Sequence, residues 1–175
     1  MQFTIGKGSN FATPLANILN YGKPSRIVWA VMFDKSCEYP QLVLNGQPYN
    51  GFNKAAGIAF NLLKPNDNAA MLGWRWNALT QLIELTPYFN VDGDNVYDES
   101  NMLTCVPGDS VSVIVTIEQT KLVSVIVRTT RGRIFKSVQF KNTFGWTSIY
   151  HIVNIWFGGQ LPAPQTVSAN VTKIA

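Results

Sequence analysis

The stretch that decides the fold is residues 71–77, which read Met-Leu-Gly-Trp-Arg-Trp-Asn. Large apolar side chains alternate in it with small or polar ones, so Trp74 and Trp76 point to one side while Arg75 and Asn77 point to the other. A period of two is typical of a β-strand with one buried face. Because tryptophan offers a very large area for burial, the pattern predicts that this strand lies at the centre of a β-structure.

The two tryptophans are therefore predicted to be mostly buried, together with Trp29. On the opposite face, Arg75 is expected to pair with Glu84 of the neighbouring hairpin strand, because a cross-strand arginine–carboxylate pair supports a sheet. Loss of the Trp74 side chain should then cost roughly 3–5 kcal/mol of stability.

Outward from this strand, the chain repeats the same kind of segment. Residues 110–118 are the clearest example, with valine or isoleucine at every second position. Turn residues such as Asn45-Gly46 and Asp92-Gly93-Asp94-Asn95 separate the segments. The other expected strands cover residues 3–5, 26–34, 41–44, 55–61, 81–91, 95–105, 122–128, 133–140, 148–157 and 166–174.

Helical periodicity is almost absent from the chain. A single helical turn is expected within residues 14–20, because Pro14 suits the first helical position. Many short strands with frequent turn signals predict an all-β fold. We expect one domain over residues 1–175, an antiparallel β-sandwich of jelly-roll-like form.

Composition narrows the possible partners. Charged residues make up 14% of the 175 residues and the net charge is +4. One basic cluster stands out, but nucleic-acid-binding proteins concentrate more charge than this, so no nucleic-acid partner is expected. No apolar run approaches the roughly 18 residues of a membrane span, and no signal peptide is visible, so we expect a cytoplasmic protein without a membrane partner. The basic cluster comprises Lys121, Arg128, Arg131, Arg133, Lys136 and Lys141.

Few residues offer catalytic or metal-binding chemistry. Cys37 and Cys105 are expected to be buried free thiols, although one disulfide is the alternative. His151, the only histidine, is expected to be packed and hydrogen-bonded, because a zinc site needs three or four ligands.

Carboxylates offer two further candidates. Asp92, Asp94, Asn95 and Asp98 lie in one turn and could hold calcium, but an ordinary hairpin turn is favoured. Glu84 is the one candidate for a glycosidase carboxylate, and its alternation favours a charge on the solvent face of a strand. The sequence thus predicts no catalytic residue, no metal site and no cofactor.

Exposed aromatic residues could bind a sugar. Trp146, within Phe144-Gly145-Trp146, is the tryptophan most expected to be exposed. Arg75, Asn77 and Asn53 would be its polar partners, so these four residues are the candidate ligand-binding residues.

Several phrases together resemble a known family. They follow the order and spacing of small standalone β-proteins of gut Bacteroidetes and of their crAss-like phages, over nearly the whole chain. That family carries a His-rich stretch where residues 62–70 here hold no histidine, so no metal or catalytic role is expected there. The phrases are Phe52-Asn53-Lys54-Ala55-Ala56-Gly57, Gly73-Trp74-Arg75-Trp76-Asn77, residues 83–88, Val106-Pro107-Gly108 and residues 156–164.

The resemblance implies a virion location. We therefore expect a non-enzymatic structural or interaction protein, most concretely a phage capsid-decoration protein assembled in the host cytoplasm. Its expected partners are other structural proteins or copies of itself, including a major capsid protein. Two alternatives stay open: a lectin-like carbohydrate-binding module for surface glycans, and a sandwich-fold glycosidase or lyase. A bacterial cytoplasmic location is the alternative to the virion.

Overall fold

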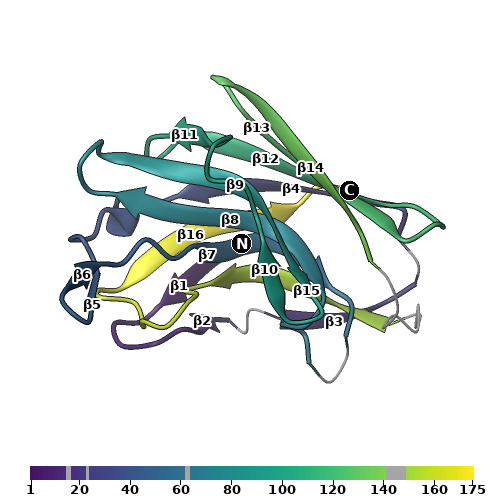
Figure 1. Cartoon of the computed structure of the whole chain (residues 1–175), viewed down its shortest axis with the longest axis horizontal. Coiled ribbons are helices and arrows are strands. Elements are labelled where there is room, and N and C mark those ends of the chain that lie inside the picture. Colours follow the sequence, from purple (N-terminus) through teal and green to yellow (C-terminus); the bar gives the residue numbers. More distant parts are fainter. Residues whose placement is uncertain (15–16, 23, 62–63, 141–148) are drawn as a thin grey trace.

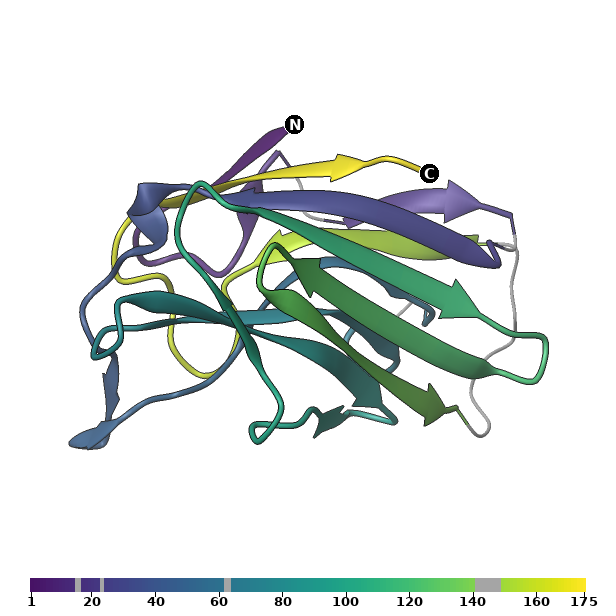
Figure 2. The same cartoon turned by 90° about the horizontal axis from the view of Figure 1, so that it is seen from above.

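The computed structural model describes residues 1–14, 17–22, 24–61, 64–140 and 149–175 of the chain. These residues form two large antiparallel sheets that pack face to face, so the predicted all-β sandwich is confirmed (Figures 1 and 2). A small two-stranded sheet, β5 (Val43–Leu44) with β6 (Gln47–Pro48), lies beside them. One short 3-10 helix, Lys35–Cys37, follows the strand that ends at Phe33.

Seven strands build the first sheet, named sheet A. Both ends of the chain lie in this sheet, because the first strand of the chain pairs with the last one. In spatial order the strands are β14 (Gly132–Gln139), β13 (Leu122–Thr129), β12 (Ser110–Ile117), β4 (Arg26–Phe33), β16 (Val167–Lys173), β1 (Gln2–Ile5) and β2 (Ala12–Thr13).

The second sheet, named sheet B, holds the tryptophan strand near its centre. In spatial order its strands are β10 (Asp94–Val96), β9 (Leu82–Val91), β8 (Ala69–Asn77), β7 (Asn53–Ala59), β15 (Ile149–Trp156) and β3 (Asn17–Tyr21). A further strand, β11 (Leu103–Cys105), also pairs with β9.

Alternate residues of both sheets meet in one core. On β12 the inward residues include Val111, Val113 and Val115, and on β8 they include Leu72 and Trp74. Trp29 and Trp74 are fully buried, as predicted from the alternation. Trp76 is only half-buried, because β8 ends beside it and the chain turns away, so the prediction of a mostly buried indole was too strong.

Two predicted elements are wrong. The expected helical turn overlaps β3, because Asn17–Tyr21 pairs with β15 and sheet pairing overrides the local proline signal. The expected strand over residues 95–105 is split into β10 and β11. The Asp98 carboxylate accepts hydrogen bonds from the Ser100 N–H and hydroxyl, and this closes a turn between them.

The expected turns and thiols are confirmed. Asn45 and Gly46 both have positive φ between β5 and β6, and so do Asp92 and Gly93 between β9 and β10. Such turns match the twist of an antiparallel hairpin. Cys37 and Cys105 are buried free thiols.

Two further features concern the chain as far as the structure describes it. No helix there is long and apolar enough to cross a membrane. Within the same residues, no three histidine, cysteine or acidic side chains gather closely enough to hold a metal ion.

Candidate functional site

The outer face of sheet B, which points away from sheet A, carries the unusual chemistry of this molecule. Along β8 the inward residues Ala70, Leu72 and Trp74 enter the sandwich core, whereas Ala69 and Met71 belong to a second apolar cluster. The residues between the core positions therefore point to the outer face.

The pairing of strands sets the order of side chains on this face. Lys54 of β7 lies opposite Gly73 of β8, and Gly73 lies opposite Thr86 of β9. On the other side of Lys54 comes Trp156 of β15. Because paired residues share a face, one row runs across the sheet from Trp156 through Lys54 to Thr86.

Glycine in the middle of this row makes room for an aromatic ring. A Cβ atom on Gly73 would lie 3.0 Å from Cδ2 and 3.1 Å from Cβ of Tyr88. The Tyr88 side chain therefore leans across Gly73 toward Lys54, whose Nζ lies 5.2 Å from the centre of the Tyr88 ring. This is the distance of a cation–π contact.

Lys54 is a half-buried amine with unusual surroundings. Among the described residues no carboxylate forms an ion pair with it. Burial lowers the pKa of the Lys54 ammonium, because a charged group loses hydration when it is desolvated. Lysines with a lowered pKa and no ion-pair partner are suited to accept a proton or to receive an anionic ligand.

Phenol and phenyl rings continue from Lys54 along the face. Tyr88 stacks on Tyr97 with ring centres 5.3 Å apart, and Phe52 packs edge-on against Tyr97 at 5.1 Å. Burial, together with the nearby phenols of Tyr97 and Tyr49, raises the pKa of the Tyr88 hydroxyl. Tyr88 therefore stays protonated over the range in which Lys54 titrates, and its side chain is itself buried.

Tyr49, from the loop before β7, packs at the end of this row of aromatic side chains. Tyr49 packs against Gly51 and Gly159 so closely that neither glycine has room for a Cβ atom. Its hydroxyl accepts a hydrogen bond of 2.9 Å from the Gln160 N–H. Loop residues 49–52 are thereby fixed against the segment that follows β15.

Two hollows flank this group of residues. One of about 170 Å³ lies beside Lys54 and is lined by Asn10, Phe11, Trp156 and Gly158, among others. Phe11 is strongly exposed and packs edge-on against Trp156, with ring centres 6.0 Å apart. The other, of about 460 Å³, lies beside Arg75 and is named the Arg75 pocket; its lining includes Gln41, Asn50, Trp76, Asn77, Leu79 and Glu84.

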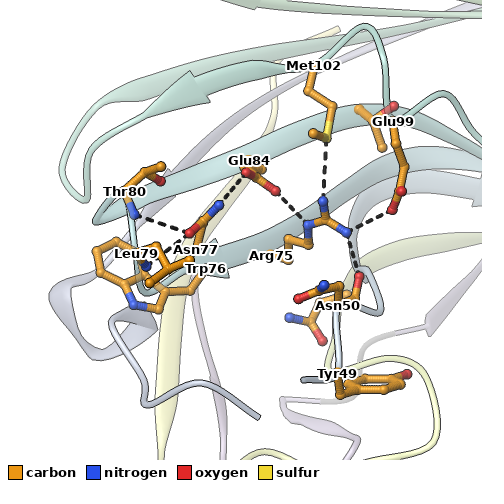
Figure 3. A network of polar contacts seen from close by, with 12 residues as sticks. Tyr49, Asn50, Arg75, Trp76, Asn77, Leu79, Thr80, Glu84, Glu99 and Met102 are labelled. Carbon is orange, nitrogen blue, oxygen red and sulfur yellow. Dashed lines mark hydrogen bonds and ion pairs between the residues drawn. The ribbon is translucent and has the colours of Figure 1, made fainter. Parts of the chain in front are cut away.

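Arg75 is the centre of a polar network at the edge of this pocket (Figure 3). Its Nε donates to Oε2 of Glu84 at 2.6 Å, and its Nη1 donates to Oε1 of Glu99 at 2.9 Å and to the backbone oxygen of Asn50 at 2.6 Å. The guanidinium also lies over the Phe52 ring, 4.4 Å from its centre. The predicted pair of Arg75 with Glu84 is confirmed.

Glu84 is buried, so the expectation of a solvent-facing carboxylate is wrong. Arg75 covers one of its oxygens, and Nδ2 of Asn77 donates to the other at 2.7 Å. Both oxygens are therefore occupied within the chain.

The sequence-predicted ligand residues are only partly brought together. Arg75 and Asn77 lie side by side at the Arg75 pocket. Asn53 is buried, where its side chain binds the Tyr39 hydroxyl at 3.1 Å and the Gly158 N–H at 2.9 Å. Trp146 lies outside the described residues. A ligand role for these four residues stays a prediction.

The sequence alone did not assign a catalytic role to Lys54, Tyr88 or Tyr97. Lys54 lies far from the two tyrosines in the chain and meets Tyr88 only because the pairings of β7, β8 and β9 place them on one face. Tyr88 and Tyr97 meet across the β9–β10 hairpin. The sequence patterns that indicate catalysis, such as carboxylate pairs, histidines and metal ligands, do not include a lysine beside a tyrosine. The one available signal was Gly73 within the tryptophan strand, since a glycine there allows a neighbouring side chain to lean across.

Comparison with known proteins finds solved structures that are similar to this chain. No protein-family model matches the chain, and no curated protein sequence does. Among solved structures, the alginate lyase vAL-1 from Chlorella virus superimposes with a TM-score of 0.58 at 13% identity, covering 98% of this chain and 81% of that one. The alginate lyase Aly36B gives a TM-score of 0.53 at 10% identity, covering 98% and 78%. A mutant of Aly36B with one lysine and one tyrosine changed to alanine, in complex with an alginate tetrasaccharide, gives 0.55 at 11% identity, covering 98% and 78%.

These likenesses concern the fold, and they overturn two expectations. The sequence favoured a non-enzymatic phage structural protein such as a capsid-decoration protein, and no enzyme activity. The sandwich that matches this chain along 98% of its length is instead a catalytic scaffold in vAL-1 and Aly36B. Carboxylate pairs mark a glycosidase, so a sandwich enzyme without such a pair gives no comparable signal in its sequence. The resemblance to Bacteroidetes and phage proteins and the virion location stay untested predictions.

Proposed function

We propose that this protein is a polysaccharide lyase that cleaves a uronate-containing polysaccharide on the outer face of sheet B. The observation that carries the proposal is the contact of Lys54 with Tyr88, in which a desolvated amine without a carboxylate partner among the described residues meets a phenol of raised pKa. The likeness of the whole chain to alginate lyases supports it. A lysine and a tyrosine are also the residues changed in the Aly36B mutant that was solved with an alginate tetrasaccharide.

Lyase chemistry requires a base and an acid near a uronate residue. The C5 proton of a uronate is acidified by the adjacent carboxylate, and its removal lets the C4–O4 bond break. Such an elimination uses no water molecule and no carboxylate nucleophile, so it fits a site that lacks a pair of free carboxylates.

Lys54 is assigned as the base. In its neutral form, Nζ takes the C5 proton, and the electrons of the C5–H bond form the C4–C5 double bond. Burial favours that neutral form, because it lowers the Lys54 pKa.

The acid comes from the stacked pair of Tyr88 and Tyr97, in which Tyr88 is buried and Tyr97 is the exposed member that can reach the substrate. When the C4–O4 bond breaks, O4 leaves with the bonding electrons and takes a proton from the phenol. The resulting phenolate then recovers a proton from the Lys54 ammonium, which returns both groups to their starting state.

The hollow beside Lys54 offers a surface for the sugar ring. Phe11 and Trp156 present apolar ring faces and edges there, and Asn10 adds an amide. Pyranose rings carry apolar C–H faces that pack on aromatic side chains, while their hydroxyls need polar partners.

The test measures the ultraviolet absorbance of the unsaturated uronate that an elimination leaves at the new chain end. Wild-type protein is assayed on alginate, polygalacturonate, polyglucuronate, gellan and hyaluronan. Lys54→Met should lower the rate on the cleaved polymer by about 100-fold or more, as expected for loss of a general base. The matched control is Lys173→Met, an exposed lysine on sheet A, which should leave the rate unchanged.

Single tyrosine variants then identify the acid. Tyr88→Phe or Tyr97→Phe should cause a similar loss, whereas Tyr150→Phe, which removes a phenol in the sandwich core, should not. The proposal is refuted if none of the polymers yields unsaturated product, or if Lys54→Met cleaves as fast as wild type.

A further inference from the structure

The charge of Arg75 is already neutralised within the chain. Glu84 and Glu99 both bind its guanidinium, and the side chains of Arg75 and Glu84 are only 14% and 11% exposed. One arginine faces two carboxylates, so this group carries a net charge of −1. A uronate carboxylate placed here would meet Glu84 and Glu99 instead of a free guanidinium, and like charges at close range oppose binding.

The Arg75 pocket is nevertheless built to accept a polar ligand. Its volume of about 460 Å³ lies within the range of ordinary small-ligand sites. Nε2 of Gln41 already donates to the backbone oxygens of Leu42 and Tyr49, so Gln41 offers its amide oxygen as an acceptor and Asn50 its amide nitrogen as a donor for hydroxyl groups. The half-buried indole of Trp76 offers an apolar ring on the same wall.

An exposed leucine at the mouth of this pocket needs an explanation. Leu79 is 93% exposed, yet its position is fixed. The Asn77 side chain accepts hydrogen bonds from the N–H groups of Leu79 and Thr80, at 3.0 and 3.2 Å, and so holds the turn after β8 (Figure 3). An apolar side chain carried on this fixed turn beside a polar pocket can pack on the apolar face of a sugar ring.

The Arg75 pocket lies on the same face of sheet B as the Lys54 site, with Phe52 between the two. Arg75 follows Gly73 by two residues on β8, and Gly73 pairs with Lys54, so Arg75 and Lys54 share the outer face. The Phe52 ring contacts the Arg75 guanidinium on one side and packs against Tyr88 and Tyr97 on the other. A polysaccharide bound at Lys54 can therefore extend past Phe52 into the Arg75 pocket.

We infer that the Arg75 pocket binds a neutral sugar unit of the same chain whose uronate lies at Lys54. This inference rests on the proposed lyase function and specifies its substrate class: a polysaccharide in which uronates are separated by neutral sugars, rather than an unbroken run of uronates. Trp76, Leu79 and the amides select the neutral unit, and the carboxylates around Arg75 disfavour a charged one.

The experiment compares alginate, in which every unit is a uronate, with gellan and hyaluronan, in which neutral units flank each uronate. Wild-type kcat/KM should be at least about tenfold higher on a flanked polymer than on alginate, which corresponds to about 1.4 kcal/mol. Glu99→Gln removes one carboxylate from Arg75 and should narrow that ratio. Glu118→Gln, an exposed carboxylate of the β12–β13 loop, should leave it unchanged.

Affinity is measured beside turnover. Oligosaccharides of the same three polymers are titrated calorimetrically into the Lys54→Met variant, with Leu79→Ala added as a second change. The tighter binding of the flanked oligosaccharides should be lost with Leu79→Ala, while alginate binding should not change.

The outcomes separate this inference from the proposed function. If kcat/KM and affinity are as high for alginate as for the flanked polymers, the neutral-sugar pocket is overturned and the lyase function stands. A clear binding preference for flanked oligosaccharides, with no cleavage of any polymer, overturns the lyase function and supports the pocket.

Discussion

Removal of the Trp74 indole probes the core that holds the proposed site in place. Trp74 is fully buried and packs against Phe33 and Phe157, with ring centres 4.9 and 6.2 Å away. Burial of roughly 200 Å² of aromatic surface at about 25 cal/mol per Å² is worth about 5 kcal/mol. No described residue accepts a hydrogen bond from its Nε1, and such an unpaired donor costs about 1–3 kcal/mol in the native state.

The free energy of burial and the cost of the unpaired N–H together predict different results for two substitutions. Trp74→Ala should lower the free energy of unfolding by about 3 kcal/mol, because the lost burial exceeds the relief of the unpaired N–H. Trp74→Phe should lower it by less than about 1 kcal/mol, because a ring still contacts Phe33 and the unpaired donor is gone.

Urea denaturation followed by far-ultraviolet circular dichroism measures both, since this signal does not depend on tryptophan. With a slope of about 2 kcal/mol per M, the midpoint should fall by about 1.5 M for Trp74→Ala and by no more than about 0.5 M for Trp74→Phe. Trp76→Ala serves as the comparison and should cost about half as much as Trp74→Ala, because Trp76 is only half-buried. The reasoning is refuted if the phenylalanine variant is as unstable as the alanine variant.

Three further perturbations test the outer face of sheet B. Glu84→Gln should lower stability by about 2 kcal/mol in urea denaturation, because it weakens a largely buried ion pair of Arg75; a cost below about 0.5 kcal/mol would contradict that role. Lys54→Met should raise the free energy of unfolding at neutral pH. Between the lowered pKa of Lys54 and the ordinary pKa of lysine, the unfolded chain binds more protons than the folded one, so wild-type stability rises with pH through this window. The stability gained with methionine should therefore vanish above the window. A gain that does not depend on pH would count against this reasoning. Gly159→Ala should cost about 1–3 kcal/mol, because the new Cβ meets the Tyr49 ring and φ is +81°; in a Tyr49→Ala background the cost should shrink to about 1 kcal/mol, and an undiminished cost would show that the ring is not the obstacle.

Local alternation was enough to predict most of the sandwich. The strand around Trp74 and the strand at residues 110–118 reveal their buried faces through period two alone, because one face of each enters the core. The prediction failed at β3, where the partner strand β15 determines the structure and the local sequence does not. It failed again between β10 and β11, where side-chain hydrogen bonds of Asp98 make a turn.

The candidate site was less accessible to sequence reasoning. The pair of Arg75 with Glu84 could be predicted, because both residues lie on one hairpin and their register follows from its turn. The contact of Lys54 with Tyr88 could not, because it depends on the pairing of separate strands and on the space above Gly73. Their chemistry also arises from burial, which changes the pKa of Lys54 and Tyr88 and leaves no trace in a local motif.

The most direct measurement of the central claim is the mass of the products formed in ¹⁸O-labelled water. An elimination at Lys54 breaks the C4–O4 bond without water, so one new chain end should be an unsaturated uronate, lighter by one water than a hydrolysis product, and neither end should carry ¹⁸O from the cleavage. The Lys54→Met variant should form almost none of it. Incorporation of ¹⁸O at the cleaved bond, or intact polymer after exhaustive incubation with gellan, hyaluronan and the uronate homopolymers, would contradict the account.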